Sequence, residues 1–282
     1  MHYAVAELTA ELSATSNATA SATDNLQRAQ WRKSLVAFQA RLHWRNHFMQ
    51  RLESALNMEL EAINPAYRHI EYCDSDPVLH AWITGRTGLP LIDACIRCLA
   101  ATGFLNFRMR AMLITTGCFG MAQSWQALQY PLPRLFLDYE PGIHFSQVQM
   151  QAGVVGINTV RVYSPLKQLT DHDPDTQFIT QFITQWVPEL RNFDSKLITH
   201  YDSVSLGDYP SPVVDIKVTA KKIKDQIYAV RQSEQGRREA GVMLRDHDSR
   251  KRTTTRKSTR ATKPGINESQ LTLDFRFVVP PV

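Results

Sequence analysis

Apolar side chains recur every three or four residues along most of this chain, and that spacing restricts it to a helical fold. The pattern is clear from Trp31 to Leu56 and again from Leu91 to Leu99, where apolar positions share one helix face. No run alternates apolar and polar residues for long enough to predict a sheet, and the best strand candidate, Val160 to Tyr163, is short. We therefore predict an all-α fold in which loops carry the unusual residues.

Prolines and glycines predict where several helices begin and end. Asp76 and Pro77 predict a helix start with Asp76 as the N-cap, and Gly85 predicts its end. A second helix is expected to begin near Pro90 and to end at Gly103.

Three later stretches also carry a local prediction. The sequence Thr-Gln-Phe-Ile at 176–179 is repeated at 180–183, and a helix can absorb such an insertion because four residues make about one turn. Phe178 and Phe182 then stay on one face. Residues 209–212 (YPSP) are typical of a linker, whereas residues 218–239 predict a very basic helix.

Composition and cysteine usage exclude several classes of protein. A hydrophobic fraction of 43% and a charged fraction of 21% exclude a wholly disordered chain. The absence of a long apolar run and of a secretory signal predicts a cytoplasmic protein with no membrane partner, which we expect to be a monomer. Cys95 and Cys98 lack a second pair, and His43 and His47 lack a third ligand, so no metal site is predicted. The two cysteines are expected to fill the core.

Charge is distributed unevenly along the chain. The net charge is +5, but residues 217–263 hold 15 Lys and Arg against 5 Asp and Glu, which leaves −5 on the rest. The run 249–263 has seven basic residues and no acidic one. Such a run is expected to be a solvated, disordered tail that attracts polyanions at low salt.

We predict three segments on this basis: a weakly ordered N-terminal segment 1–30, a helical domain 31–245, and a basic tail 246–282 that ends in a short apolar motif. That motif, Gln270 to Phe275 (QLTLDF), resembles the peptide by which bacterial repair proteins dock on the sliding clamp. The alternative is an apolar strand that folds back onto the domain.

Five motifs, in order and at near-family spacing, resemble the C-terminal flavin-binding domain of the DNA photolyase and cryptochrome family. The resemblance covers roughly residues 31–245 and implies a helical domain that holds FAD in a central cavity, with DNA docking over its mouth. The motifs are WITGRTGLPLIDA at 82–94, TGFLNFRMRAM at 102–112, LDYEPG at 137–142, RVYSP at 161–165, and DPD at 173–175 through WVPEL at 186–190.

The resemblance also implies roles for individual residues. Arg110 matches the arginine that pairs with an aspartate, here Asp138, beside the reactive edge of the flavin, where a cation favours the reduced, anionic ring. Trp44 matches the tryptophan that stacks on a flipped-out lesion. In full, the resemblance implies cofactor contacts from Trp44, Arg45, Asn106, Phe107, Arg110, Asp138, Tyr139, Glu140 and His144, catalytic roles for Trp44, Arg110, Asp138, His144, Trp125 and Tyr72, and DNA contacts from Arg41, Trp44, Met150 and Arg161, to which the basic tail adds Lys251 and Arg252.

The residues by themselves leave other interpretations open. Arg110 with Asp138 is also consistent with a buried structural ion pair, and Trp44 with an ordinary core aromatic. The chain departs from the family pattern as well: we expect no antenna domain, and the loop that binds the FAD phosphates has no clear match. In the usual electron relay, the tryptophan nearest the flavin aligns with Val148 or a neighbouring residue and not with a tryptophan, so we expect slow photoreduction.

The predicted function is light-driven repair of pyrimidine dimers in DNA, in which reduced FAD passes an electron to a flipped lesion. The alternative is a cryptochrome-like light sensor or DNA-binding module, or a remnant that has lost repair.

Overall fold

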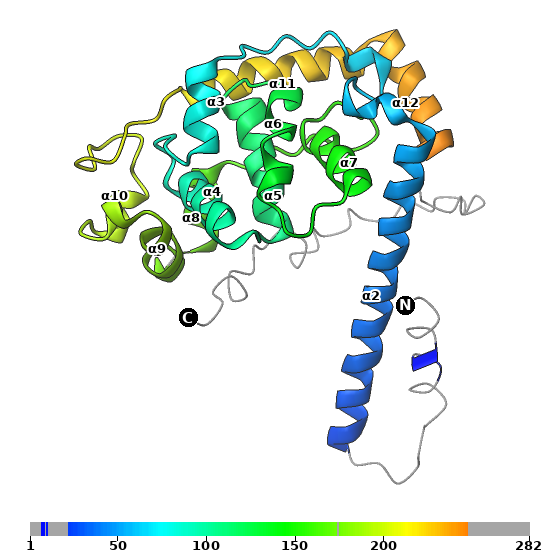
Figure 1. Ribbon diagram of the computed structural model, residues 1–282, viewed down its shortest axis with the longest axis horizontal. Helices are drawn as coiled ribbons and strands as arrows, with labels where there is room; N and C mark the ends of the chain where they lie inside the picture. Colours follow the sequence, from blue (N-terminus) through cyan, green and yellow to red (C-terminus); the bar gives the residue numbers. More distant parts are fainter. Residues whose placement is uncertain (1–6, 9, 11–21, 174, 248–282) are drawn as a thin grey trace, which may run out of the picture. The chain divides into compact units, whose positions relative to one another are not determined.

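A computed structural model of the protein describes residues 7–8, 10, 22–173 and 175–247. Every regular element within these residues is a helix, which confirms the all-α prediction (Figure 1). Val160 to Tyr163, the best strand candidate in the sequence, form no regular element, and no strand is present among the described residues. The predicted tail beyond residue 247, with Lys251, Arg252 and the motif Gln270 to Phe275, lies outside the described residues.

The chain divides into two compact units, which are described separately. The first contains the described residues up to Leu56 together with Pro141–Ile143. Its main element is the long helix α2, Ala22–Ser54, which begins earlier than the apolar pattern at Trp31 because its first turns are polar. The backbone of Gly142 lies close to this helix, where an added Cβ would be 2.9 Å from Met49 Cα.

The second unit contains the other described residues and the hydrophobic core. Leu91, Ile92, Cys95 and Leu99 on one helix are almost fully buried, as the helical spacing predicted. The α-helices of this unit are α3 (Asp76–Ile83), α4 (Pro90–Thr102), α5 (Phe107–Thr115), α6 (Trp125–Gln129), α7 (Pro141–Gln151, from His144 onward), α8 (Pro165–His172), α9 (Thr184–Trp186), α10 (Ser195–Ile198), α11 (Ile216–Gln232) and α12 (Glu234–His247). Short 3-10 turns are η1 (Leu56–Glu59, which begins at the unit boundary), η2 (Pro65–Tyr67), η4 (Leu132–Arg134) and η6 (Pro188–Leu190).

Helix ends follow the predicted signals with one correction. Gly103 follows α4 in the left-handed conformation, with φ of +70°. Asp76 is the first residue of α3 rather than its N-cap, because Ser75 takes the extended N-cap conformation and Pro77 occupies the second helical position. The acidic side chain still lies at the positive end of the helix.

Two π-helical turns interrupt the regular helices. The first, η3 (Thr116–Gly120), extends α5 at the point where threonines and a glycine interrupt the apolar run. The second, η5 (Ile179–Ile183), lies on the four-residue duplication and confirms that the helix absorbs it. Phe178 and Phe182 are buried and stacked with ring centroids 4.9 Å apart, so both remain on the core side.

Cys95 and Cys98 are buried, which confirms their prediction as core filler. Burial raises the pKa of both thiols, which therefore stay protonated. No group of His, Cys, Asp or Glu in the described part of the chain is arranged to hold a metal ion. None of the described helices is long and apolar enough to cross a membrane.

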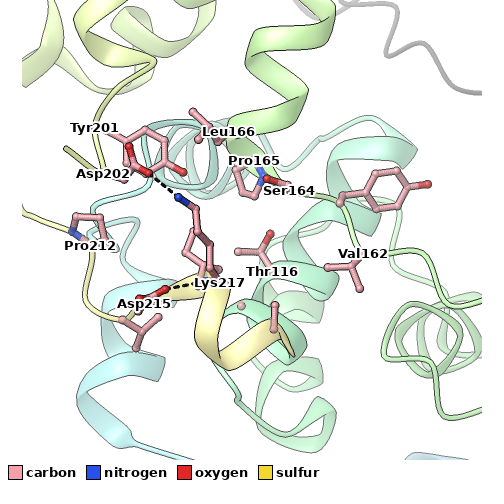
Figure 2. Close-up of a pocket in the computed structure, with 15 residues that line it drawn as sticks. Thr116, Val162, Ser164, Pro165, Leu166, Tyr201, Asp202, Pro212, Asp215 and Lys217 are labelled. Atoms are coloured by element: carbon pink, nitrogen blue, oxygen red, sulfur yellow. Dashed lines mark hydrogen bonds and ion pairs between the residues drawn. The ribbon is translucent and has the colours of Figure 1, made fainter. Parts of the chain in front are cut away.

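A pocket of about 520 Å³ opens where α8 and α11 begin (Figure 2). Its walls are mostly apolar, and Lys217 Nζ lies 3.3 Å from Asp202 Oδ2 at one side. The buried hydroxyl of Thr116 points toward the start of α8 in this view and has no partner among the described residues. None of the residues that the resemblance assigns to FAD lines this pocket.

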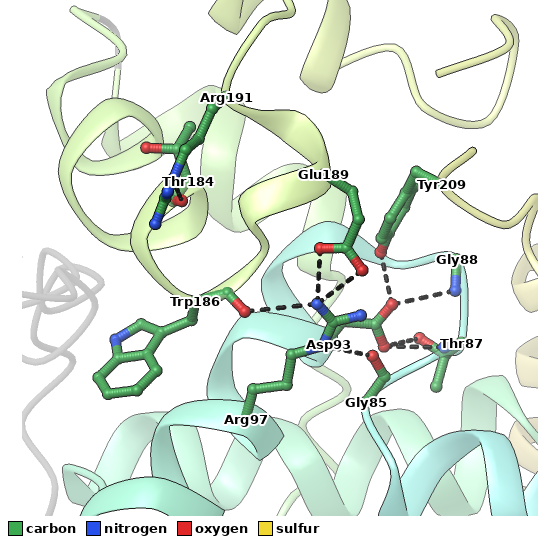
Figure 3. A network of polar contacts seen from close by, with 10 residues as sticks. All are labelled: Gly85, Thr87, Gly88, Asp93, Arg97, Thr184, Trp186, Glu189, Arg191 and Tyr209. Atoms are coloured by element: carbon green, nitrogen blue, oxygen red, sulfur yellow. Dashed lines mark hydrogen bonds and ion pairs between the residues drawn. The ribbon is translucent and has the colours of Figure 1, made fainter. Parts of the chain in front are cut away.

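A buried polar network joins the start of α4 to the segment predicted as a linker (Figure 3). Asp93 Oδ1 accepts hydrogen bonds from the amide and the hydroxyl of Thr87, at 2.8 and 2.6 Å. Its Oδ2 accepts from the amide of Gly88 and from the Tyr209 hydroxyl, at 3.2 and 2.5 Å. Tyr209 is only 5% exposed. The segment 209–212 is therefore packed on the domain rather than acting as a linker.

Candidate functional site

Arg110 is held at the first turns of α5 by backbone and side-chain groups. Asn106 Oδ1 caps this helix by accepting a hydrogen bond from the Met109 amide at 3.0 Å. Arg110 Nε donates to the carbonyl of Leu105 at 2.5 Å, and Nη2 donates to Asp138 Oδ2 at 3.0 Å. The predicted pairing of Arg110 with Asp138 is therefore present, and the guanidinium has a fixed orientation.

Aromatic rings surround this guanidinium. Its central carbon lies 4.2 Å from the centroid of the Phe136 ring and 5.5 Å from that of Phe104. Neither phenylalanine was among the predicted site residues, although Phe104 lies within the motif at 102–112 and Phe136 directly precedes the motif at 137–142. Phe104 is 58% exposed, Phe107 is 61% exposed and Leu137 is 86% exposed. An apolar surface thus borders the ion pair, which is typical of a site for a large planar ligand.

A close backbone contact brings the two motifs of this site together. The amide of Leu137 donates to the carbonyl of Gly103 at 3.0 Å. A Cβ built on Gly103 would lie 2.4 Å from Leu137 Cγ, so only glycine fits there. The loop that carries Asp138 is thereby fixed beside the N-terminus of α5.

The ion pair is not buried, so the buried structural pair considered above is not what the structure shows. The Asp138 side chain is 53% exposed and that of Arg110 is 25% exposed. A pair this exposed adds only about 0–1 kcal/mol to stability. The pair therefore contributes little to the stability of the fold.

His144 lies close to this pair and is buried. Its Nε2 is 2.9 Å from the carbonyl oxygen of Gln129, which can only accept, so Nε2 carries the proton. The Tyr139 ring meets the imidazole edge-on, with centroids 5.4 Å apart. Burial lowers the pKa of His144, and the charge of Arg110 lowers it further, against the raising effect of the Gln129 hydrogen bond. His144 is therefore neutral at pH 7.

Acid should destabilise the protein through this buried imidazole. The unfolded chain takes up the proton near the ordinary pKa of 6.5, whereas the folded chain takes it up at lower pH. The stabilisation is complete above pH 6.5 and is lost as the pH falls from there toward the folded pKa, by at most about 1.4 kcal/mol per pH unit. Between pH 7.5 and pH 5.5, the melting temperature should fall less in His144→Gln than in wild type. An equal fall would contradict this, and the exposed His80→Gln is the control.

Glu140 and Tyr139 are positioned by the same turn. The carbonyl of Glu140 accepts from the amide of His144 at 2.8 Å, at the start of α7. Burial raises the pKa of the Tyr139 phenol, and the charges of Glu59 and Glu140 raise it further, so the hydroxyl remains a donor. One turn along α7, Gln147 Oε1 is buried and has no partner among the described residues. It is an acceptor that the N–H of a ligand can satisfy.

The predicted relay residue Trp125 lies in the core, as does Val148, where the relay pattern expects a tryptophan, whereas Tyr72 is half-buried. Trp125 and Val148 are each 2% exposed. The Tyr72 hydroxyl is buried with no hydrogen-bond partner in the described part of the chain, and burial raises its pKa well above the usual value. A phenol must lose its proton when it is oxidised, and Tyr72 has no acceptor there. We therefore expect it to be a poor electron donor.

The remaining predicted residues are spread over other elements. Arg41, Trp44 and Arg45 lie on α2, in the first unit; Trp44 is 42% exposed, so it is not a buried core residue. Its ring packs within α2 against His47 and Phe48, with centroids 6.0 and 5.5 Å apart.

Two predicted DNA contacts lie in the second unit. Met150 is half-buried on α7, and Arg161 is exposed before α8.

A family model described as the FAD binding domain of DNA photolyase matches residues 38–229. The chain belongs to the DNA photolyase and cryptochrome family. Among curated proteins, it is 30% identical over 194 residues to the deoxyribodipyrimidine photo-lyase of Halobacterium salinarum, covering 65% of this chain and 39% of that protein. It is also 30% identical over 151 residues to a cryptochrome DASH of Solanum lycopersicum, covering 53% and 26%. The chain thus spans less than half the length of these relatives.

Solved photolyase structures share the fold. The archaeal photolyase of Sulfolobus tokodaii, solved with two FAD molecules, superimposes with a TM-score of 0.64 at 26% identity, covering 72% of this chain and 46% of that one. The class III photolyase of Agrobacterium tumefaciens gives a TM-score of 0.62 at 21% identity, covering 81% and 47%, which supports the fold alone. The family's cofactor is FAD, and the exposed aromatic surface, the oriented Arg110 and the orphaned Gln147 acceptor fit such a ligand.

Proposed function

We propose that this protein repairs pyrimidine dimers in DNA with light, using FAD bound beside Arg110 and Asp138. The observation that carries the proposal is the orientation of Arg110, whose guanidinium is fixed by Leu105 and Asp138 and bordered by exposed apolar rings. The sequence identity to a photolyase and to a cryptochrome supports membership of the family, and the repair reaction is our proposal.

When bound in its reduced form, FAD supplies the light-excited electron that opens a dimer and then takes that electron back. Arg110 places a positive charge at the ring edge and so favours the reduced form. Asp138, which is half exposed, keeps the guanidinium in place without neutralising it as fully as a buried carboxylate would. Neutral His144 donates from Nε2 to the Gln129 carbonyl, so its Nδ1 carries no proton and can accept a hydrogen bond.

DNA is the proposed substrate, and its lesion would be recognised after it is flipped out of the stack. Trp44 is an exposed ring on α2 and supplies a stacking surface, with Arg41 one turn earlier on the same helix. We propose Met150 and Arg161 as further DNA contacts in the second unit.

The second candidate is a cryptochrome-like sensor or DNA-binding module that does not repair DNA, and the relay residues count against repair. The Tyr72 hydroxyl has no proton acceptor among the described residues, and Val148 stands where a tryptophan is expected, so reduction of the flavin by this route should be slow. A protein that must reduce its own flavin for repair gains nothing from this arrangement.

The test is a repair assay that does not depend on the relay. The purified full chain should show flavin absorption near one FAD per protein. The flavin is then reduced chemically without oxygen, and an oligonucleotide with one thymine dimer is added in light or in darkness. We expect dimers to be lost only in light. Bound flavin without light-dependent loss would support the sensor, and absence of flavin would support the remnant.

A further inference from the structure

Basic side chains form a straight stripe along α11. Lys217, Lys221, Lys224, Tyr228 and Arg231 follow one another at spacings of four, three, four and three residues. These are the spacings that keep side chains on one face of a helix. From first to last the stripe is about 21 Å long, at 1.5 Å per residue.

The face of α11 beside this stripe is buried and fixes its direction, with Lys217, Lys221 and Lys224 exposed and Tyr228 and Arg231 half-buried. Ile223 and Ile227 are fully buried in the core. The Thr219 hydroxyl donates to the carbonyl of Gly120, and Gln226 exchanges hydrogen bonds of 3.0 and 3.1 Å with the backbone of Glu71. The helix therefore cannot rotate about its axis, and it lies along the upper edge of its unit in Figure 1.

The basic side chains of the stripe differ in whether they contact other residues of the protein. Lys221 and Lys224 are exposed, and neither forms an ion pair with a described residue. Lys217 is 3.3 Å from Asp202 (Figure 2), and Arg231 Nη1 donates to the carbonyl of Asn158 at 2.6 Å. Asp225 is the only acidic residue within α11; it is exposed, lies four residues after Lys221 at the border of the stripe, and forms no ion pair with Lys221 or Lys224. The middle of the stripe therefore keeps its positive charge.

We propose that the α11 stripe is a second contact surface for DNA, which binds the phosphate backbone and not the lesion. DNA as the occupant rests on the proposed function. A linear array of cations over about 21 Å spans about six steps of 3.4 Å along one strand. Tyr228 adds a flat ring within the array, as aromatic side chains do in nucleic-acid grooves.

An anionic membrane fits this surface less well. A helix that lies on a membrane inserts its apolar face, and here that face is buried in the protein core. Partners that touch α11 must therefore be recognised by its polar face alone, as phosphates are by lysine and arginine.

The stripe lies at the far end of α5 from the candidate flavin site. Arg110 is in the first turns of α5, whereas the Thr219 contact is with Gly120 at the end of η3. Ten residues of helix separate them, which is about 15 Å. The stripe should therefore capture DNA without changing how the lesion is recognised.

The experiment compares two double variants of the full chain that lose the same charge. Lys221→Gln with Lys224→Gln removes the middle of the stripe. The control combines Lys222→Gln, whose Nζ is 3.6 Å from Cys73 Sγ off the stripe, with Lys196→Gln on α10. Affinity for duplex oligonucleotides, undamaged or with one thymine dimer, is titrated at several salt concentrations. Melting temperature and flavin content confirm that each variant is folded.

The stripe variant should lower the log–log salt slope by about 1.8, at about 0.9 per phosphate contact, and weaken both duplexes by the same factor. Each single variant should give about half of that effect, and the control much less. Equal slopes in the stripe variant and the control would overturn the proposal, as would a change in lesion preference. A wild-type protein without lesion preference that still shows the stripe effect would instead count against the proposed function.

Discussion

Replacing Arg110 by alanine is expected to lower the flavin content of the purified protein at least ten-fold. The flavin ring would lose its charge-assisted hydrogen bond with the guanidinium. Such hydrogen bonds contribute about 1.5–3 kcal/mol. The flavin-to-protein absorbance ratio measures the effect after dialysis under matched conditions. Asp138→Asn should lower the ratio less, because that carboxylate acts by orienting Arg110 and is half exposed.

The chain offers a matched control for this variant. Arg191 is exposed, and its Nε donates to the Thr184 carbonyl at 3.1 Å, as Arg110 Nε does to Leu105. Arg191→Ala thus removes the same groups at a different position in the chain, directly after η6. Equal flavin ratios in wild type, both Arg110 and Asp138 variants and this control would refute the assignment. Because the Arg110 pair is exposed, loss of flavin should occur with little change in the stability of the flavin-free protein.

Replacing Asp93 by alanine is expected to have the largest effect on stability. The substitution leaves four donors from Thr87, Gly88 and Tyr209 without their acceptor in a buried site. Each buried group left unsatisfied costs about 1–3 kcal/mol. With partial relaxation, we expect a loss of about 3–5 kcal/mol, the range seen when one partner of a buried charged network is removed. That corresponds to a melting temperature lower by about 10 °C in a domain of this size.

Two further variants separate the network from general effects. Tyr209→Phe removes one of the four donors and should cost about 1–2 kcal/mol. Asp208→Ala removes an exposed carboxylate next to Tyr209 and should change little. Burial raises the pKa of Asp93 although its hydrogen bonds to Thr87 and Tyr209 lower it. The folded state therefore binds this proton more tightly than the unfolded state does. The free energy of unfolding of wild type should gain a contribution as the pH falls through the raised pKa of Asp93, and Asp93→Ala should lack this contribution. A wild-type melting temperature in Asp93→Ala would show that the network does not hold the 209–212 segment.

Periodicity in the sequence was enough to predict the helical class and where several of its helices begin and end. The spacing of Leu91, Ile92, Cys95 and Leu99 placed one helix and its buried face, and Gly103 marked its end. The duplicated Thr-Gln-Phe-Ile was predicted to be absorbed, and Phe178 and Phe182 do stack on the core side. Such signals are local, because the helix period and the left-handed glycine conformation depend on neighbours within a few residues.

The sequence motifs also indicated the pairing of Arg110 with Asp138, although 28 residues separate them. What they could not indicate was the exposure of the pair or the rings of Phe104 and Phe136 around it. Exposure depends on which segments pack over a side chain, and no local pattern records that. The same holds for His144, whose neutral state follows from burial and from the carbonyl of Gln129.

The segment 209–212 shows most clearly what only the tertiary structure decided. Two prolines and two hydroxyl residues are typical of an exposed linker, and nothing nearby in the sequence requires burial. The Tyr209 hydroxyl nevertheless donates a hydrogen bond to a carboxylate 116 residues earlier in the chain. Because Gly88 has no side chain, the backbone of Ser211 can pack directly against it. The sequence by itself thus determined the helices, their ends and the residue types of the site. Tertiary packing decided which polar groups are buried and satisfied and which remain open to a ligand, because burial is a property of contacts between distant segments.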